Sequence, residues 1–302
     1  MEELSFPVLD YKRVRKPLPW KDLLVEIGFG RGEFLLRLAE ENPHRKVLGF
    51  EVSGVSVEKL LRRLRDRNPG NVFCVRIDAY WGFSLLLEDR SVERIYMNYP
   101  DPWFKKRHVK RRLTRMENLY LFARKLREKG EIRIRTDHPP FIDYTVEEAE
   151  GLGCFSWEVR KLRVQEPLTK YEERWLRMGK EIRELILRKE KEPGELEIKT
   201  LKEVAVLFPV EVKGREPRPE LICNQEFSLP EEVHLRFFDT YRREGSLLIE
   251  VLLSEKGFVQ KFFVSVRRKG DRYVVDVSPF SQVLRTEGVQ KTVRFVAERG
   301  FG

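Results

Sequence analysis

The sequence predicts a doubly wound α/β domain followed by a smaller α+β domain. Short apolar strands alternate with helical patterns from about residue 22 to residue 136, which is typical of a parallel sheet covered on both faces. The right-handed crossover rule then leaves a Rossmann-like arrangement. A Pro193-Gly194 pair breaks the chain, and the alternating apolar runs beyond it indicate antiparallel strands.

The elements of the first domain follow from the spacing of apolar residues. Strands are expected at residues 23–27, 46–51, 72–77, 92–98 and 131–136, with a further strand at 155–164. Helical spacing marks residues 32–39, 55–67 and 113–129, and residues 171–191 have the composition of a long charged helix.

The second domain is expected to contain three antiparallel strands, at residues 246–253, 257–267 and 272–278, and a closing helix at 282–299. Lys256-Gly257 and Lys269-Gly270-Asp271 supply the turns between the strands. The predicted organisation is a basic N-terminal arm at 1–20, an α/β domain at 21–193 and an α+β extension at 195–302.

The charge of the chain is concentrated in the first domain. The net charge is +10, but residues 195–302 contain 18 Lys and Arg against 17 Asp and Glu. The segment from Lys105 to Arg115 contains seven basic residues and no acidic residue. A surplus of this kind indicates a polyanionic partner.

Several classes of site and location are disfavoured. The three cysteines, Cys74, Cys154 and Cys223, form no CxxC pair, which argues against a disulfide framework or a zinc site. Cys74 lies in an apolar strand pattern and is expected in the core. The histidines show no ligand spacing, so no metal is expected. Without a signal-like or membrane-length apolar run, a cytoplasmic protein is predicted. The oligomeric state stays open, with a monomer slightly favoured.

A glycine turn follows the first predicted strand and opens the first helix. Gly28, Gly30 and Gly32 give the spacing GxGxG, and glycines are needed where the backbone turns sharply beside a ligand. A dinucleotide site prefers GxGxxG, but the sixth position here is Glu33. A carboxylate there disfavours a pyrophosphate and suits the cationic S-adenosylmethionine.

Acidic residues at the ends of successive strands complete the expected cofactor site. Glu26 lies beside the glycine turn, and Glu51 ends the second strand, where a carboxylate can accept hydrogen bonds from ribose hydroxyls. Asp78 ends the third strand beside Ala79 and can bind an adenine amino group. The alternative is that Glu51 and Asp78 are polar caps. The predicted cofactor-binding residues are Glu26, Gly28, Gly30, Gly32, Glu51, Asp78, Ala79 and Asn98.

A proline-bracketed aspartate follows the fourth strand, where ligands bind in open parallel sheets. Pro100 and Pro102 hold Asp101 between them, so its carboxylate can accept hydrogen bonds from a guanine N1–H and amino group. Guanine N7 already has a free lone pair, and its methylation needs mainly alignment and electrostatics. Trp103 either stacks on the base or packs against the sheet, and packing is favoured.

The basic run beside this loop is predicted to grip a phosphate backbone. A run of charges is usually a solvated face, but this one adjoins a candidate active site and has no interleaved acids. The predicted RNA-binding residues are Lys106, Arg107, His108, Lys110, Arg111, Arg112 and Arg115.

Four segments carry a resemblance to a known family. These are EIGFGRGEF at 26–34, NYPDPWFKKRHVKRRL at 98–113, RTD at 135–137 and TKYE at 169–172. The chain resembles the bacterial tRNA (guanine-N7-)-methyltransferases over about residues 20–190, with the second domain outside the shared region. Tyr99 stands where Phe is frequent in the family.

The resemblance implies a Rossmann-like class I fold and methylation of a guanine in the tRNA variable loop with S-adenosylmethionine. It implies that Asp101 is the catalytic residue. The substrate-binding residues that it implies are Lys105, Asp137, Thr169, Lys170, Tyr171 and Glu172. Two of these assignments have alternatives. Asp137 can be a strand-end cap, and Thr169 with Glu172 can form a helix capping box.

Three other functions compete with this interpretation. Asn98-Tyr99-Pro100 is similar to the NPPY-type motif of adenine-N6 methyltransferases, but position 101 is Asp. A tRNA-binding protein without catalysis is disfavoured by the intact acidic residues of the cofactor site. A nicotinamide oxidoreductase is disfavoured by Glu33.

Overall fold

A computed structural model describes residues 7–14, 16–103, 106–162 and 181–302. The chain forms two compact units, residues 1–198 and 199–302. The described part of the first unit contains a seven-stranded sheet, and that of the second a six-stranded sheet.

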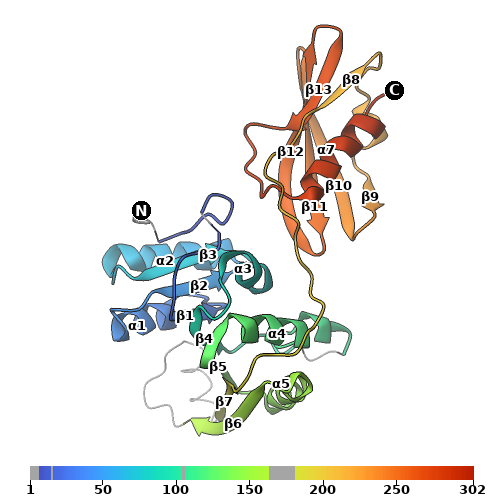
Figure 1. Ribbon diagram of the computed structural model, residues 1–302. Coiled ribbons are helices and arrows are strands. Elements are labelled where there is room, and N and C mark those ends of the chain that lie inside the picture. Colours follow the sequence, from blue (N-terminus) through green and yellow to red (C-terminus); the bar gives the residue numbers. More distant parts are fainter. Residues whose placement is uncertain (1–6, 15, 104–105, 163–180) are drawn as a thin grey trace. The chain divides into compact units, whose positions relative to one another are not determined.

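The first sheet has the strand order β3-β2-β1-β4-β5-β7-β6 (Figure 1). The five strands from β3 to β5 run parallel, and β7 is antiparallel to both β5 and β6. Its strands are β1 (Leu23–Ile27), β2 (Val47–Glu51), β3 (Val72–Arg76), β4 (Val92–Asn98), β5 (Leu126–Thr136), β6 (Phe155–Leu162) and β7 (Ile182–Lys189). The predicted Rossmann-like fold is confirmed.

Helices cover both faces of this sheet. Helices α1 and α2 pack on β2 and β3, while α4 and α5 pack on β5. The α1 side of the core contains Leu35, Leu38 and Leu60, all at most 5% exposed. The helices of this unit are α1 (Glu33–Glu41), α2 (Gly54–Asp66), α3 (Ala79–Leu86), α4 (Met116–Lys125) and α5 (Pro139–Leu152), with a 3₁₀ helix at Lys106–Arg111.

The prediction of a long charged helix at residues 171–191 is wrong for residues 181–191, the part of this range that the structure describes. Ile182–Lys189 is strand β7, hydrogen-bonded between β5 and β6. Ile182, Leu185 and Ile186 have the i, i+3, i+4 spacing of a helix, but pairing on both sides overrides this local pattern. Residues 171–180 lie outside the described part.

Three other helices of the first unit differ from the sequence prediction: one is shorter than predicted and two were not predicted. The helix predicted at 113–129 is α4, which ends at Lys125 because the chain enters β5 at Leu126. Helix α3 was not predicted, since six of its eight residues are buried and it has no polar face. Helix α5 was also not predicted. Its first two residues are prolines, which a helix tolerates in its first turn.

The described residues of the basic N-terminal arm, 7–14 and 16–20, are part of the first unit's fold. Leu9 N donates to Cys74 O at 2.8 Å, and Cys74 N donates to Pro7 O at 2.7 Å. These bonds pair the arm with β3. Leu18 and Trp20 are also buried. Cys74 has no exposed surface, as expected for a core residue.

The second unit is an antiparallel sheet with one long helix, in agreement with the α+β prediction. The order is β8-β13-β12-β11-β10-β9, and α7 packs against β8, β11 and β13 (Figure 1). The elements are β8 (Val210–Lys213), β9 (Glu226–Leu229), β10 (Val233–Arg243), β11 (Ser246–Glu255), β12 (Phe258–Lys269), β13 (Arg272–Val277) and α7 (Glu287–Arg299). The three predicted strands correspond to β11, β12 and β13.

Candidate active site

The glycine turn after β1 has the backbone conformation that its sequence requires. Gly28, Gly30 and Gly32 have φ angles of 72°, 53° and 76°, a region that side chains disfavour. A Cβ atom on Gly28 or Gly30 would meet nothing within 4 Å, whereas one on Gly32 would lie 2.6 Å from Leu60 Cδ1. The first two glycines therefore border open space, and the third permits close packing of α1 on α2.

Glu51 fastens this turn to the end of β2. Its Oε2 atom accepts a hydrogen bond from Gly30 N at 3.0 Å. Its Oε1 atom accepts from Val52 N at 2.9 Å and Ser53 N at 3.0 Å. The carboxylate is thus held at the carboxyl edge of the sheet, and Oε2 keeps a lone pair for a second donor.

Glu26 is buried beside the turn and linked to β4. Glu26 is 2% exposed, and its Oε1 atom accepts a hydrogen bond from Asn98 Nδ2 at 3.0 Å. Its Oε2 atom is buried without a partner among the described residues. Burial raises the pKa of Glu26 to about 8. A buried acceptor without a donor marks a place where a ligand can supply one.

Asp78 follows β3 by two residues. It caps α3, because its Oδ1 atom accepts from Tyr80 N at 2.9 Å. The capping role that the sequence left open for Asp78 is therefore present. Ala79 begins α3 and is 4% exposed. Since β3, β2, β1 and β4 are adjacent and parallel, Asp78, Glu51, Glu26 and Asn98 share one edge of the sheet.

The loop that carries Asp101 is bracketed by two strained residues. Tyr99 and Trp103 have φ angles of 56° and 46°, which is uncommon for aromatic residues, and Tyr99 also precedes Pro100, where the backbone is restricted further. Tyr99 N donates to Arg135 O at 2.8 Å. Such strain persists only where surrounding contacts enforce it, and here it presents Asp101 as an exposed residue.

The arginines of the predicted RNA-binding run fall into two groups: some are exposed to solvent, and one donates a hydrogen bond to the Asp101 loop. Arg107 is exposed. Arg111 is also exposed, and its guanidinium lies 5.0 Å from the ring centroid of Trp103. Arg112 turns inward: its Nε donates to Pro102 O at 2.9 Å, and its guanidinium lies 4.3 Å from the ring centroid of Tyr144. Arg112 therefore holds the Asp101 loop in place.

The remaining predicted site residues are either half-buried or outside the described residues. Arg115 Nη2 donates to Asn118 Oδ1 at 3.3 Å, and Asp137 is half-buried after β5. Lys105 and residues 169–172 lie outside the described residues, as do the side chains of Lys106, His108 and Lys110.

Sequence reasoning missed Arg135, which lies between the cofactor edge and β7. Its Nε donates to the buried Glu184 Oε1 at 3.1 Å, and its guanidinium lies 5.8 Å from the ring centroid of Phe34. Its charge lowers the pKa of Glu26, against the larger opposing effect of burial. The alternation in EIRIRT at residues 131–136 is the signal that places Arg133 and Arg135 on one face.

The arrangement fits S-adenosylmethionine. Open space beside two glycines, an unsatisfied buried carboxyl atom and a second carboxylate at the neighbouring strand end suit a cationic ligand with hydroxyl and amino donors. Glu33 is paired with Arg63 at 2.6 Å, so Glu26 and Glu51 are the carboxylates that disfavour a pyrophosphate. The antiparallel β7 inserted before β6 also departs from the dinucleotide-binding order. Fold and site define a Rossmann-like, S-adenosylmethionine-dependent methyltransferase.

Comparisons with known proteins narrow this class. Residues 21–185 match a family described as putative methyltransferase. A tRNA (guanine-N(7)-)-methyltransferase from Aquifex aeolicus is 52% identical over 290 residues, which cover 96% of this chain and 98% of that protein. The chain belongs to the tRNA (guanine-N7-)-methyltransferase family.

More distant relatives share the same name. One from Thermotoga maritima is 29% identical over 94% of this chain and 93% of its own length. One from Leifsonia xyli is 38% identical over 53% of this chain and 73% of its own length. The expectation that the second domain lies outside the shared region is wrong for the Aquifex and Thermotoga proteins, because both alignments must include most of it.

Two further properties concern the described residues alone. They contain no group of three or more His, Cys, Asp or Glu residues arranged to hold a metal ion. None of their helices has the length and apolar character needed to cross a membrane.

The raised pKa of Glu26 predicts a pH-dependent stability difference. Between the usual pKa near 4.5 and the folded value near 8, the folded state binds more protons, so wild-type stability falls as pH rises through this window. Glu26→Gln removes this effect. Without cofactor, the unfolding free energy of the variant relative to wild type should rise from pH 5 to pH 8, by at most about 1.4 kcal/mol per pH unit.

Denaturant unfolding at several pH values measures this difference. Glu147→Gln, at an exposed position of α5, is the matched control and should show no such trend. A stability difference for Glu26→Gln that is the same at pH 5 and pH 8 would contradict the assignment.

Proposed function

We propose that the chain transfers the methyl group of S-adenosylmethionine to N7 of a guanine in the variable loop of tRNA, acting in the cytoplasm and as a monomer. The observation that carries this proposal is the bond between Glu26 and Asn98, which joins the acid-lined cofactor edge to the strand that leads into the Asp101 loop. The relatives' names supply the substrate: guanine N7 in tRNA.

The cofactor supplies a methyl group bound to a positively charged sulfur. Glu26 Oε2 and the free lone pair of Glu51 Oε2 accept hydrogen bonds from its polar groups. Asp78 and Ala79 would lie next to the adenine base of the cofactor. Gly28 and Gly30 leave room for close approach of the ligand to the backbone.

Asp101 orients the substrate base. Its carboxylate accepts hydrogen bonds from N1–H and the amino group of guanine, which present N7 toward the donor. Because the N7 lone pair is free, no proton is removed before the attack. The residues contribute alignment and charge stabilisation, and the prolines and the Arg112 contact hold Asp101 for this purpose.

The remaining predicted residues bind the RNA around the reacting base. Exposed Arg107 and Arg111 contact phosphates with Lys105, Lys106, His108 and Lys110, while Asp137 and the Thr169, Lys170, Tyr171 and Glu172 segment contact the nucleoside. Arg115 adds positive charge to the same segment of the chain. Support comes from the density of basic residues and from the motif match.

Incubation with tRNA and labelled S-adenosylmethionine, followed by nucleoside analysis, tests the proposal. We expect 7-methylguanosine from wild type and a loss of about a hundredfold in kcat for Asp101→Asn, with cofactor binding retained. Asp143→Asn, at an exposed position of α5, is the control and should keep full activity. A product of N6-methyladenosine, or no cofactor binding by wild type, would overturn the assignment.

Arg107 and Arg112 should separate RNA binding from loop positioning. Arg107→Gln should weaken tRNA binding and reduce the slope of log K against log salt by about 0.9, because one phosphate contact is lost. Arg112→Gln should lower kcat with the salt slope unchanged, since its guanidinium is committed to Pro102 and Tyr144. Equal effects of the two changes on the salt slope would reject this division.

A further inference from the structure

Five arginines lie on one face of the four strands β4, β5, β7 and β6. Strand register places Arg94 opposite Glu131 and Glu131 opposite Arg188. It also places Arg135 opposite Glu184 and Glu184 opposite Arg160. We call this surface the arginine face; it consists of Arg94, Arg133, Arg135, Arg160 and Arg188.

The arginine face is opposite the side of the sheet that α5 covers. Trp157 alternates with Ser156 and Glu158 along β6, so it points away from the arginine face. Trp157 Nε1 donates to Glu150 Oε1 of α5 at 3.1 Å. The side chains of Arg94, Arg133, Arg160 and Arg188 remain 31%, 29%, 51% and 49% exposed.

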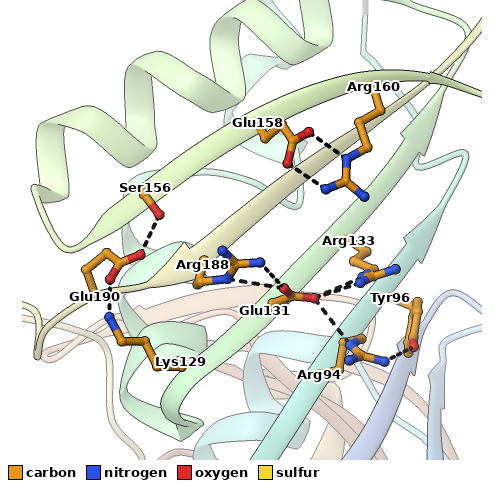
Figure 2. Close-up of polar contacts among 10 residues, drawn as sticks. All are labelled: Arg94, Tyr96, Lys129, Glu131, Arg133, Ser156, Glu158, Arg160, Arg188 and Glu190. Carbon is orange, nitrogen blue, oxygen red and sulfur yellow. Dashed lines mark hydrogen bonds and ion pairs between the residues drawn. The ribbon is translucent and has the colours of Figure 1, made fainter.

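Three of these arginines converge on one carboxylate (Figure 2). Glu131 lies 3.4 Å from Arg94 Nε, 2.9 Å from Arg133 Nη2 and 2.8 Å from Arg188 Nη2. Its side chain is 11% exposed. One carboxylate offers about four lone-pair sites, whereas three guanidinium groups carry about fifteen N–H donors. The cluster therefore retains unused donors and a net positive charge.

The arginine face as a whole also carries more positive than negative charge. The face holds five arginines and three acidic residues, Glu131, Glu158 and Glu184. A network that served stability alone would gain most from matched pairs, since unpaired like charges repel each other. Partly buried guanidinium forks held by a shared carboxylate are instead preorganised for phosphate oxygens.

The arginine face begins at the active-site edge. Arg135 is opposite Asn98 in register, and its carbonyl oxygen accepts from Tyr99 N at 2.8 Å. From Arg135 back to Glu131 the strand extends roughly 13 Å away from that edge. A chain of phosphates that leaves the reacting base in this direction meets the guanidinium groups in succession.

We propose that the arginine face binds the phosphate backbone of the substrate RNA outside the reacting base, as a second contact area beside the Lys105–Arg115 segment. This inference rests on the proposed function, because it takes the RNA substrate from it. The face contributes affinity and orientation of the RNA, and it takes no part in the transfer of the methyl group.

The test is the salt dependence of tRNA binding by Arg188→Gln and Arg133→Gln, between about 0.05 and 0.5 M salt. Each lost phosphate contact should reduce the log–log slope by about 0.9, a difference of about eightfold in relative affinity per tenfold change in salt. Arg188→Lys keeps the charge but not the fork, and should restore most of the slope.

Arg65→Gln, at an exposed position of α2, removes the same charge elsewhere in the unit and should leave the slope near that of wild type. Melting temperature and S-adenosylmethionine binding establish that each variant is folded. Slopes for Arg188→Gln and Arg133→Gln that equal that of Arg65→Gln overturn the proposal.

The failure of this inference is distinguishable from failure of the proposed function. If the arginine face is not an RNA contact, wild type still forms 7-methylguanosine and the slopes stay unchanged. If the proposed function fails, wild type forms no 7-methylguanosine, while altered slopes still show a phosphate contact on the arginine face.

Discussion

A buried carboxyl group near the end of β1 joins the two halves of the site. Glu26 closes β1, where the chain turns into the glycine loop, and its bond to Asn98 reaches the end of β4, which leads into the Asp101 loop. Burying this group raises its pKa and opposes folding as the pH rises. A ligand can supply the donor that Glu26 Oε2 lacks among the described residues, and in the proposed function this is the reason for the cost in stability.

The rest of the site depends on the same edge of the sheet. Parallel pairing of β3, β2, β1 and β4 brings their carboxyl ends together, and Glu51 then fixes the glycine turn through Gly30 N. On the other side, the carbonyl of Arg135 and the guanidinium of Arg112 hold the strained loop from Tyr99 to Trp103. The residues proposed to bind the cofactor and to align the base therefore lie on one edge of the sheet, in two loops that are anchored by hydrogen bonds.

Much of this organisation could be predicted from local sequence. Short apolar strands, the glycine spacing and acids at strand ends each depend on residues close in the chain, so β1 and β4 were predicted correctly, and the residues predicted to bind the cofactor do lie along one edge of the sheet. Strand β7 could not be recognised, because its apolar spacing also fits a helix and its identity depends on pairing with β5 and β6. The inward contact of Arg112 with Pro102 and Tyr144, and the convergence of three arginines on Glu131, depend on tertiary neighbours that a basic run or an alternating strand does not reveal.

The central claim is that Glu26 is the buried acceptor completed by the cofactor. Because its pKa is near 8 without ligand, Glu26 is mostly protonated at pH 7, and accepting the donors of a cationic ligand requires its ionisation. Calorimetric titration of S-adenosylmethionine in two buffers of different ionisation enthalpy measures the protons released on binding. The account predicts that wild type releases nearly one proton more per site at pH 7 than Glu26→Gln. Equal proton release by the two proteins would contradict it.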